Sequence, residues 1–197
     1  MASILAKSAD RIVSDLVRSG IIEDEDRELY AYGIEQTAVI MINMLSAAVL
    51  GLLTGQLVQC ALFFLCYIPL RSFAGGFHAR TPMRCYIYSM IIVAAVLSIL
   101  ATVDERSILF TAAIPAACVI LAFSPVEDEN KPLDSVEKKR YRSAALKILV
   151  AELICGAQCV WADIDIRGMA AAIIVEAIML TAGIMKNARL RVKYIEK

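Results

Sequence analysis

The stretch Thr37–Leu70, "TAVIMINMLSAAVLGLLTGQLVQCALFFLCYIPL", carries no charged residue from end to end. A helix needs ~20 mostly apolar residues to cross the hydrocarbon core of a bilayer, so this stretch approaches the length of two crossings. Its middle holds Thr54, Gly55 and Gln56, a typical turn signal. The stretch therefore predicts two membrane-spanning helices joined by a tight hairpin turn.

The composition of the whole chain is that of a membrane protein. Of its 197 residues, 59% are hydrophobic, and the mean hydropathy is +0.67, which is more than a water-soluble core requires. Its 20 basic and 20 acidic residues cancel, so no overall electric field favours nucleic acid as a partner. We expect an all-α polytopic membrane protein with a lipid bilayer, and no nucleic acid, as a partner.

Six apolar runs predict about six spanning helices. They cover residues 37–55, 56–70, 85–103, 108–123, 144–162 and 168–185. No internal repeat separates them, so we predict a single membrane-embedded domain over residues 1–197. It divides into an amphipathic N-terminal region (1–35), a transmembrane bundle (36–186) and a cytoplasmic tail (187–197).

The N-terminal region predicts an amphipathic helix. Ile12, Val13, Leu16 and Val17 recur at helical spacing, opposite charged side chains. Such a helix fits either the surface of a membrane or packing against the rest of the protein.

The distribution of Lys and Arg predicts the orientation in the membrane. We assign each Lys and Arg to one of the segments before, between or after the spans. Eighteen of them lie on the same side as the N-terminus, and two, Arg106 and Arg167, lie on the other side. Cytoplasmic segments hold the excess of basic residues. Both termini and the loop between the second and third spans are therefore expected on the cytoplasmic side.

Six cysteines stand at positions 60, 66, 85, 118, 155 and 159. They include no CxxC pair and no Cys/His cluster with the spacing of a zinc site, so we expect no metal ion and no other cofactor. Five lie inside apolar runs, which is typical of small buried hydrophobic residues. Cys85 differs because it stands at a boundary between polar and apolar sequence.

The loop before the third span, "RSFAGGFHARTPMRC" (Arg71–Cys85), contains the single histidine of the chain. Thr81 is a good N-cap, and Pro82 is suited to the first position of a helix, so Cys85 is expected in the first helical turn. There the positive end of the helix dipole favours a thiolate.

Several neighbours of this predicted turn fit cysteine chemistry. Arg80 and Arg84 add positive charge beside the thiol, and Gly75 with Gly76 lets the chain fold back, so that His78 can reach the sulfur. A structural role for this histidine at the membrane interface is the alternative.

The sequence names no clear third group to orient the imidazole. Backbone carbonyls, Glu127 or Asp128 are candidates. Two further acids, Glu152 and Glu176, lie inside predicted spans, where an ionisable group needs a partner. No partner for Glu176 is evident from the sequence, and we expect pairing between helices rather than chemistry.

The motif "RSFAGGFHARTPMRC", with "YAYGIEQ" before the first span and "SPVEDENKPL" after the fourth, resembles the accessory gene regulator B (AgrB) family. These proteins are integral-membrane cysteine endopeptidases of Gram-positive bacteria that process quorum-sensing peptide precursors. The resemblance implies that His78 and Cys85 are the catalytic dyad, and that Arg71, Gly75 and Gly76 support activity. It also implies a bacterial cell membrane as the location.

The resemblance further implies an AgrD-like propeptide as the substrate. Cys85 would attack the peptide bond before its acidic C-terminal tail and form a thioester, which a substrate thiol or hydroxyl would resolve into a thiolactone or lactone. The resemblance is also compatible with a homodimer. An acidic tail would find complementary charge in five basic side chains, Arg80, Arg84, Lys138, Lys139 and Arg140, although the orientation rule alone also explains basic residues there.

Two other functions remain open. In a noncatalytic membrane peptide transporter or peptide-binding subunit, His78 and Cys85 would merely line a cavity. Such a transporter typically has two related halves with broken helices at matching positions, and Pro69 and Pro115 do not form a convincing pair. A membrane acyltransferase would be expected to carry further metal-ligand or acid/histidine motifs.

Overall fold

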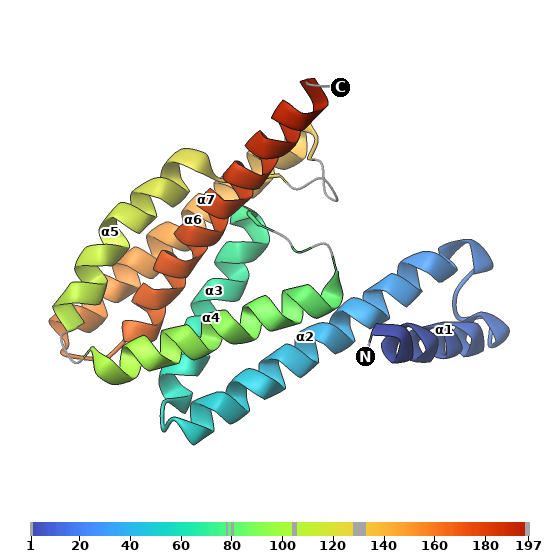
Figure 1. Cartoon of the computed structure of the whole chain (residues 1–197), viewed down its shortest axis with the longest axis horizontal. Helices are drawn as coiled ribbons and strands as arrows, with labels where there is room; N and C mark the ends of the chain where they lie inside the picture. The colour runs from blue at the N-terminus through green and yellow to red at the C-terminus, as the bar shows by residue number, and fades with distance from the viewer. Residues whose placement is uncertain (1, 78, 80, 104–105, 128–132, 196–197) are drawn as a thin grey trace. The chain divides into compact units, whose positions relative to one another are not determined.

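The computed structural model describes residues 2–77, 79, 81–103, 106–127 and 133–195. Within these ranges the chain is all helical (Figure 1). The elements are α1 (Ala2–Arg18), a 3-10 turn η1 (Asp24–Asp26), α2 (Arg27–Leu53), α3 (Leu57–Ala74), α4 (Pro82–Thr102), α5 (Arg106–Phe123), α6 (Ser135–Trp161) and α7 (Arg167–Ile195). The all-α prediction is confirmed.

Five segments are long and apolar enough to cross a membrane, as judged over the described residues. They are residues 24–53, 57–74, 83–102, 135–161 and 167–189. The fourth predicted span, Ile108–Phe123, is an apolar but shorter helix. The chain is therefore a multi-pass membrane protein.

Several helices extend beyond the predicted apolar runs. α2 begins at Arg27, ahead of the predicted start at Thr37, and α6 begins at Ser135. α7 continues to Ile195, through most of the predicted tail. A hydropathy criterion finds only the apolar part of a helix, because polar turns at its ends can extend into water.

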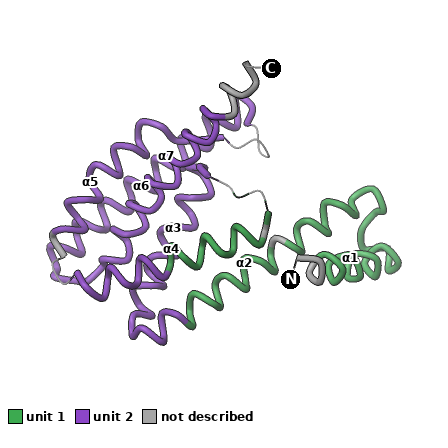
Figure 2. The backbone as a smooth tube through the Cα atoms, in the orientation of Figure 1, with its two compact units in different colours: residues 1–49, 79–93 green, residues 50–78, 94–197 purple. Residues whose placement is uncertain are grey.

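The chain divides into two compact units (Figure 2), one of residues 1–49 and 79–93, the other of residues 50–78 and 94–197. α2 and α4 each run through both units. A single domain over residues 1–197 stays our prediction.

The first unit contains α1, which packs against the start of α2. Ala9 and Val13 are buried on its apolar face. The Arg27 guanidinium donates to the Asp10 carboxylate at 2.9 Å and to the Ser14 hydroxyl at 2.8 Å. The predicted amphipathic helix is therefore present, and these contacts favour packing against the protein.

The predicted hairpin turn is also present. α2 ends at Leu53 and α3 begins at Leu57. Between them Gly55 has a φ of +67°, a conformation that glycine adopts without steric penalty. The Gln56 N–H closes the turn by donating to the Gly51 carbonyl at 2.8 Å.

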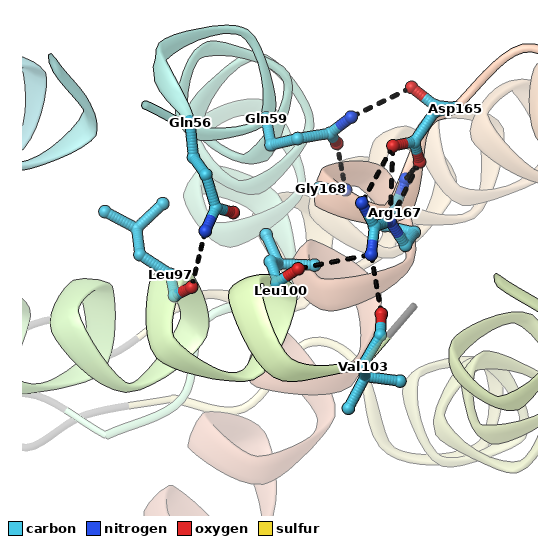
Figure 3. Close-up of polar contacts among 8 residues, drawn as sticks. All are labelled: Gln56, Gln59, Leu97, Leu100, Val103, Asp165, Arg167 and Gly168. Carbon is cyan, nitrogen blue, oxygen red and sulfur yellow. Dashed lines mark hydrogen bonds and ion pairs between the residues drawn. The ribbon is translucent and has the colours of Figure 1, made fainter. Parts of the chain in front are cut away.

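In the second unit α7 packs against α3, α5 and α6, and a polar network holds its first turn (Figure 3). The Arg167 guanidinium donates to the Leu100 carbonyl at 3.1 Å and to the Val103 carbonyl at 2.5 Å. It also contacts the Asp165 carboxylate at 3.0 Å. Because the last carbonyls of a helix lack helical partners, Arg167 caps the end of α4 while standing at the start of α7.

Gln59 joins α3 to the same network. Its amide donates to the Asp165 carbonyl at 3.1 Å and accepts from the Gly168 N–H at 2.8 Å. A Cβ on Gly168 would collide with the Gln59 carbonyl oxygen. Close contact between α3 and α7 thus depends on a glycine at this position.

We expect Arg167→Ala to lower the free energy of unfolding by about 2 kcal/mol or more, because it leaves buried carbonyl groups without a donor. Thermal unfolding of the detergent-purified protein measures the effect. Arg189→Ala, at an exposed arginine of the same helix, is the matched control and should leave the melting temperature nearly unchanged. Equal melting temperatures for the two variants would contradict the capping role.

Candidate active site

Cys85 lies in the first turn of α4, as predicted. Thr81 precedes the helix, and its hydroxyl accepts from the Arg84 N–H at 3.3 Å. The Cys85 N–H donates to the Thr81 carbonyl at 3.0 Å. Cys85 is exposed at the surface of the structure.

His78 and Arg80 lie outside the described residues. The predicted approach of the imidazole to the Cys85 sulfur therefore stays a prediction. The structure does describe the chain up to Phe77, immediately before the histidine. We call residues 75–77 the histidine loop.

Arg71, near the end of α3, forms hydrogen bonds with the histidine loop. Its Nη1 donates to the Gly75 carbonyl and its Nη2 to the Phe77 carbonyl. The guanidinium is largely buried, and its Nη1 lies 3.8 Å from the Glu176 Oε1 of α7. Both η nitrogens thus have acceptors within the protein, and Glu176 has the cationic neighbour that the sequence did not reveal.

The two glycines are required by backbone geometry. Gly75 has φ +76° and Gly76 φ +117°, both in the region that side chains disfavour. A Cβ on Gly75 would collide with the Val126 carbonyl oxygen, and one on Gly76 would lie 2.9 Å from the Met179 carbonyl oxygen. The chain can reverse here only because neither residue has a side chain.

Backbone hydrogen bonds fix the histidine loop on two sides. The Gly76 N–H donates to the Val126 carbonyl at 3.2 Å, and the Val126 N–H donates to the Ala74 carbonyl at 2.9 Å. On the other side the Phe77 N–H donates to the Met179 carbonyl of α7 at 2.9 Å. Sequence reasoning missed Val126 and Met179, since backbone pairing leaves no signal in residue type.

The segment after α5 is itself anchored, and we call residues 124–127 the strap. The Arg142 guanidinium donates to the Ser124 carbonyl at 2.6 Å, and the Asn187 amide to the Glu127 carbonyl at 2.7 Å. The Glu127 carboxylate pairs with Lys138 at 2.8 Å. Asp128, the other acid considered for orienting the imidazole, lies outside the described residues.

The remaining predicted basic residues lie at the surface. Lys139 and Arg140 are exposed near the start of α6, and Arg84 is exposed in the first turn of α4. Over the described ranges, no three His, Cys, Asp or Glu side chains are grouped so that they could hold a metal ion.

Gly76→Ala should lower the free energy of unfolding by about 1–3 kcal/mol, because the new methyl group meets backbone atoms of α7 in a strained conformation. Gly33→Ala in α2 is the control, since a Cβ there would meet nothing within 4 Å, and alanine favours a helix by up to about 1 kcal/mol. Thermal unfolding compares the two. A Gly76→Ala protein as stable as the parent would refute this account of the loop.

Comparison with known proteins agrees with the motif. No solved structure matches the chain. A putative AgrB-like protein from Clostridium perfringens (strain SM101 / Type A) is 24% identical over 76% of this chain and 74% of its own length, and putative AgrB-like protein 2 from strain 13 / Type A matches equally. The family model for accessory gene regulator B matches residues 9–185. The chain therefore belongs to the AgrB family, membrane peptidases that process AgrD propeptides in quorum sensing.

Proposed function

We propose that the protein is a membrane cysteine endopeptidase in which Cys85 is the nucleophile and His78 the general base. The place of Cys85 carries the proposal: an exposed thiol in the capped first turn of a helix, within the region that matches the family. A cysteine at such a position can act as a nucleophile once a general base accepts its proton.

In the first step His78 accepts the thiol proton and the sulfur attacks the carbonyl carbon of the peptide bond before the acidic tail of an AgrD-like propeptide. The C–N bond breaks, His78 returns the proton to the leaving amine, and the retained peptide remains on Cys85 as a thioester. General base catalysis of this kind typically contributes about 10²–10⁴-fold.

In the second step a thiol or hydroxyl of the retained peptide attacks the thioester. The C–S bond to Cys85 breaks, the sulfur regains a proton, and a thiolactone or lactone ring closes. The internal nucleophile can outcompete water because it is held nearby at high effective concentration. A site that excludes water would limit hydrolysis further.

Arg71, Gly75 and Gly76 act in this proposal by positioning the histidine loop. The guanidinium hydrogen bonds to carbonyls on either side of the turn support that role. We propose the cytoplasmic side of a bacterial cell membrane for both termini and the site, supported by the excess of Lys and Arg on that side. A propeptide made by ribosomes first appears there.

The acidic tail of the propeptide is proposed to bind basic side chains beside the site. Arg84, Lys139 and Arg140 are exposed. Lys138 is paired with Glu127, so a substrate carboxylate would compete with that acid. Arg80 is included from the sequence alone. A homodimer remains compatible with this arrangement.

Cys85→Ala and His78→Ala should abolish or strongly reduce cleavage of a precursor peptide, with a loss of about 10²-fold or more for the histidine. Mass spectrometry of the products measures this, and the Cys85 thioester should be detectable as a mass adduct. Cys118→Ala, at another exposed cysteine, is the control and should cleave normally. Normal cleavage by Cys85→Ala would reject Cys85 as the nucleophile, whereas no cleavage by the parent protein would favour a noncatalytic peptide-binding subunit.

Lys139→Glu with Arg140→Glu should raise the KM for a precursor with an acidic tail several-fold and leave a tail-neutralised precursor unaffected, because the variant removes complementary charge. The parent should lose affinity as salt increases, whereas the variant should respond less. Arg189→Glu reverses one exposed charge elsewhere and is the control for each of the two substitutions made singly. An unchanged KM would exclude these two side chains from tail binding.

A further inference from the structure

One face of α7 contacts both the histidine loop and the strap. Its members stand three, seven and eleven residues after Glu176, the spacing of a single helical face. They are Glu176, Met179, Gly183 and Asn187, and we call them the α7 scaffold face. Glu176 contacts Arg71, the Met179 carbonyl accepts from Phe77, and Asn187 donates to the Glu127 carbonyl.

Gly183 lies directly beneath the histidine loop. A Cβ at this position would lie 2.7 Å from the carbonyl carbon of Gly76, 2.8 Å from the nitrogen of Phe77 and 2.9 Å from the Cα of Gly76. All three are backbone atoms, which cannot rotate away as a flexible side chain can. A side chain on residue 183 would therefore displace the loop from α7.

Glu176 lies beside Arg71 without forming a hydrogen bond. Its side chain is 0% exposed, and neither carboxylate oxygen has a hydrogen-bond partner. Its ion pair with Arg71 spans 3.8 Å, while the two η nitrogens of that arginine donate to carbonyls of the loop. The buried carboxyl group thus lies beside the guanidinium on α7, while the planar fork of the guanidinium reaches both carbonyls of the loop.

We propose that Glu176 and Gly183 are positioning residues for the cleavage reaction. Glu176 acts through its contact with Arg71. Gly183 acts because its lack of a side chain lets the backbone of the histidine loop pack against α7. Together they set the position of Phe77, the residue immediately before His78. This inference rests on the proposed role of His78 as the general base. A merely structural charge pair between α3 and α7 is the alternative.

The test uses the full chain in proteoliposomes and two measurements. The first is cleavage of a precursor peptide, separated into kcat and KM. The second is the alkylation rate of Cys85 by iodoacetamide at neutral pH, followed by peptide mapping to separate Cys85 from the other cysteines. His78→Ala gives the alkylation rate of a thiol that has lost its base.

Glu176→Gln and Gly183→Ala should each reduce kcat about tenfold to hundredfold with little change in KM, since misplacing a catalytic group by about 1 Å has an effect of this order. In both variants the alkylation rate of Cys85 should fall toward that of His78→Ala. Gly156→Ala in α6 is the matched control, because its Cβ would meet only side-chain atoms at 3.5 Å and 3.8 Å. It should behave as the parent.

A double-variant comparison tests whether Glu176 acts through Arg71. Arg71→Lys keeps the charge beside Glu176 but cannot donate to both carbonyls in the fixed geometry of a guanidinium. If the two residues act as one unit, adding Glu176→Gln to Arg71→Lys should reduce kcat by less than about twofold further. Independent, multiplying effects would overturn the proposed route through Arg71.

The outcomes separate this inference from the proposed function. Normal cleavage by Cys85→Ala or His78→Ala would reject the proposed function and this inference with it. If those two variants are inactive but Glu176→Gln and Gly183→Ala cleave as the parent, only the positioning role is overturned. Lost cleavage with the parental alkylation rate would also overturn it. Should Glu176→Gln fail to fold, Glu176→Asp, which keeps the carboxyl group but draws it back from Arg71, replaces it in the same two measurements.

Discussion

The Arg71 guanidinium joins three parts of the chain at one point. It donates to the carbonyls of Gly75 and Phe77 and pairs with Glu176 on α7. A buried cation within a membrane protein needs compensating charge and hydrogen-bond acceptors. Here the acceptors are carbonyls of the histidine loop, so the hydrogen bonds that satisfy Arg71 also fix the shape of the loop. Because the planar fork has fixed geometry, the guanidinium fixes the loop together with the backbone hydrogen bonds to Val126 and Met179.

The second unit uses polar and close backbone contacts both at the start and in the middle of α7. Arg167 in its first turn donates to the unpaired carbonyls at the end of α4, whereas Glu176 and Gly183 receive the chain that leaves α3. Gly168 permits the close approach of Gln59 in the first turn, as Gly183 does for the histidine loop in the middle of the helix. α7 is thus fixed to α3 twice, by polar contacts that a purely apolar interface between membrane helices would lack.

This arrangement suits the chemistry that we propose. The thiol requires exposure to a peptide, and Cys85 has it at the N-terminal end of α4. The base requires a defined position, and the chain leading to it is held by the buried Arg71–Glu176 contact, by two glycines at positive φ and by backbone pairing with the strap. A ring-closing transfer from a thioester depends on the orientation of the reacting groups. A rigid loop therefore favours the reaction.

The sequence by itself determined the features that depend on near neighbours. Hydropathy located five spans and the shorter apolar helix, the turn at Gly55 joined α2 to α3, and Thr81 with Pro82 placed Cys85 in a first turn, because caps and turns are set within a few residues. Only the tertiary structure paired Glu176 with Arg71 and laid the strap and Met179 against the loop. These contacts join segments far apart in the chain through charge and backbone groups, which local periodicity does not encode.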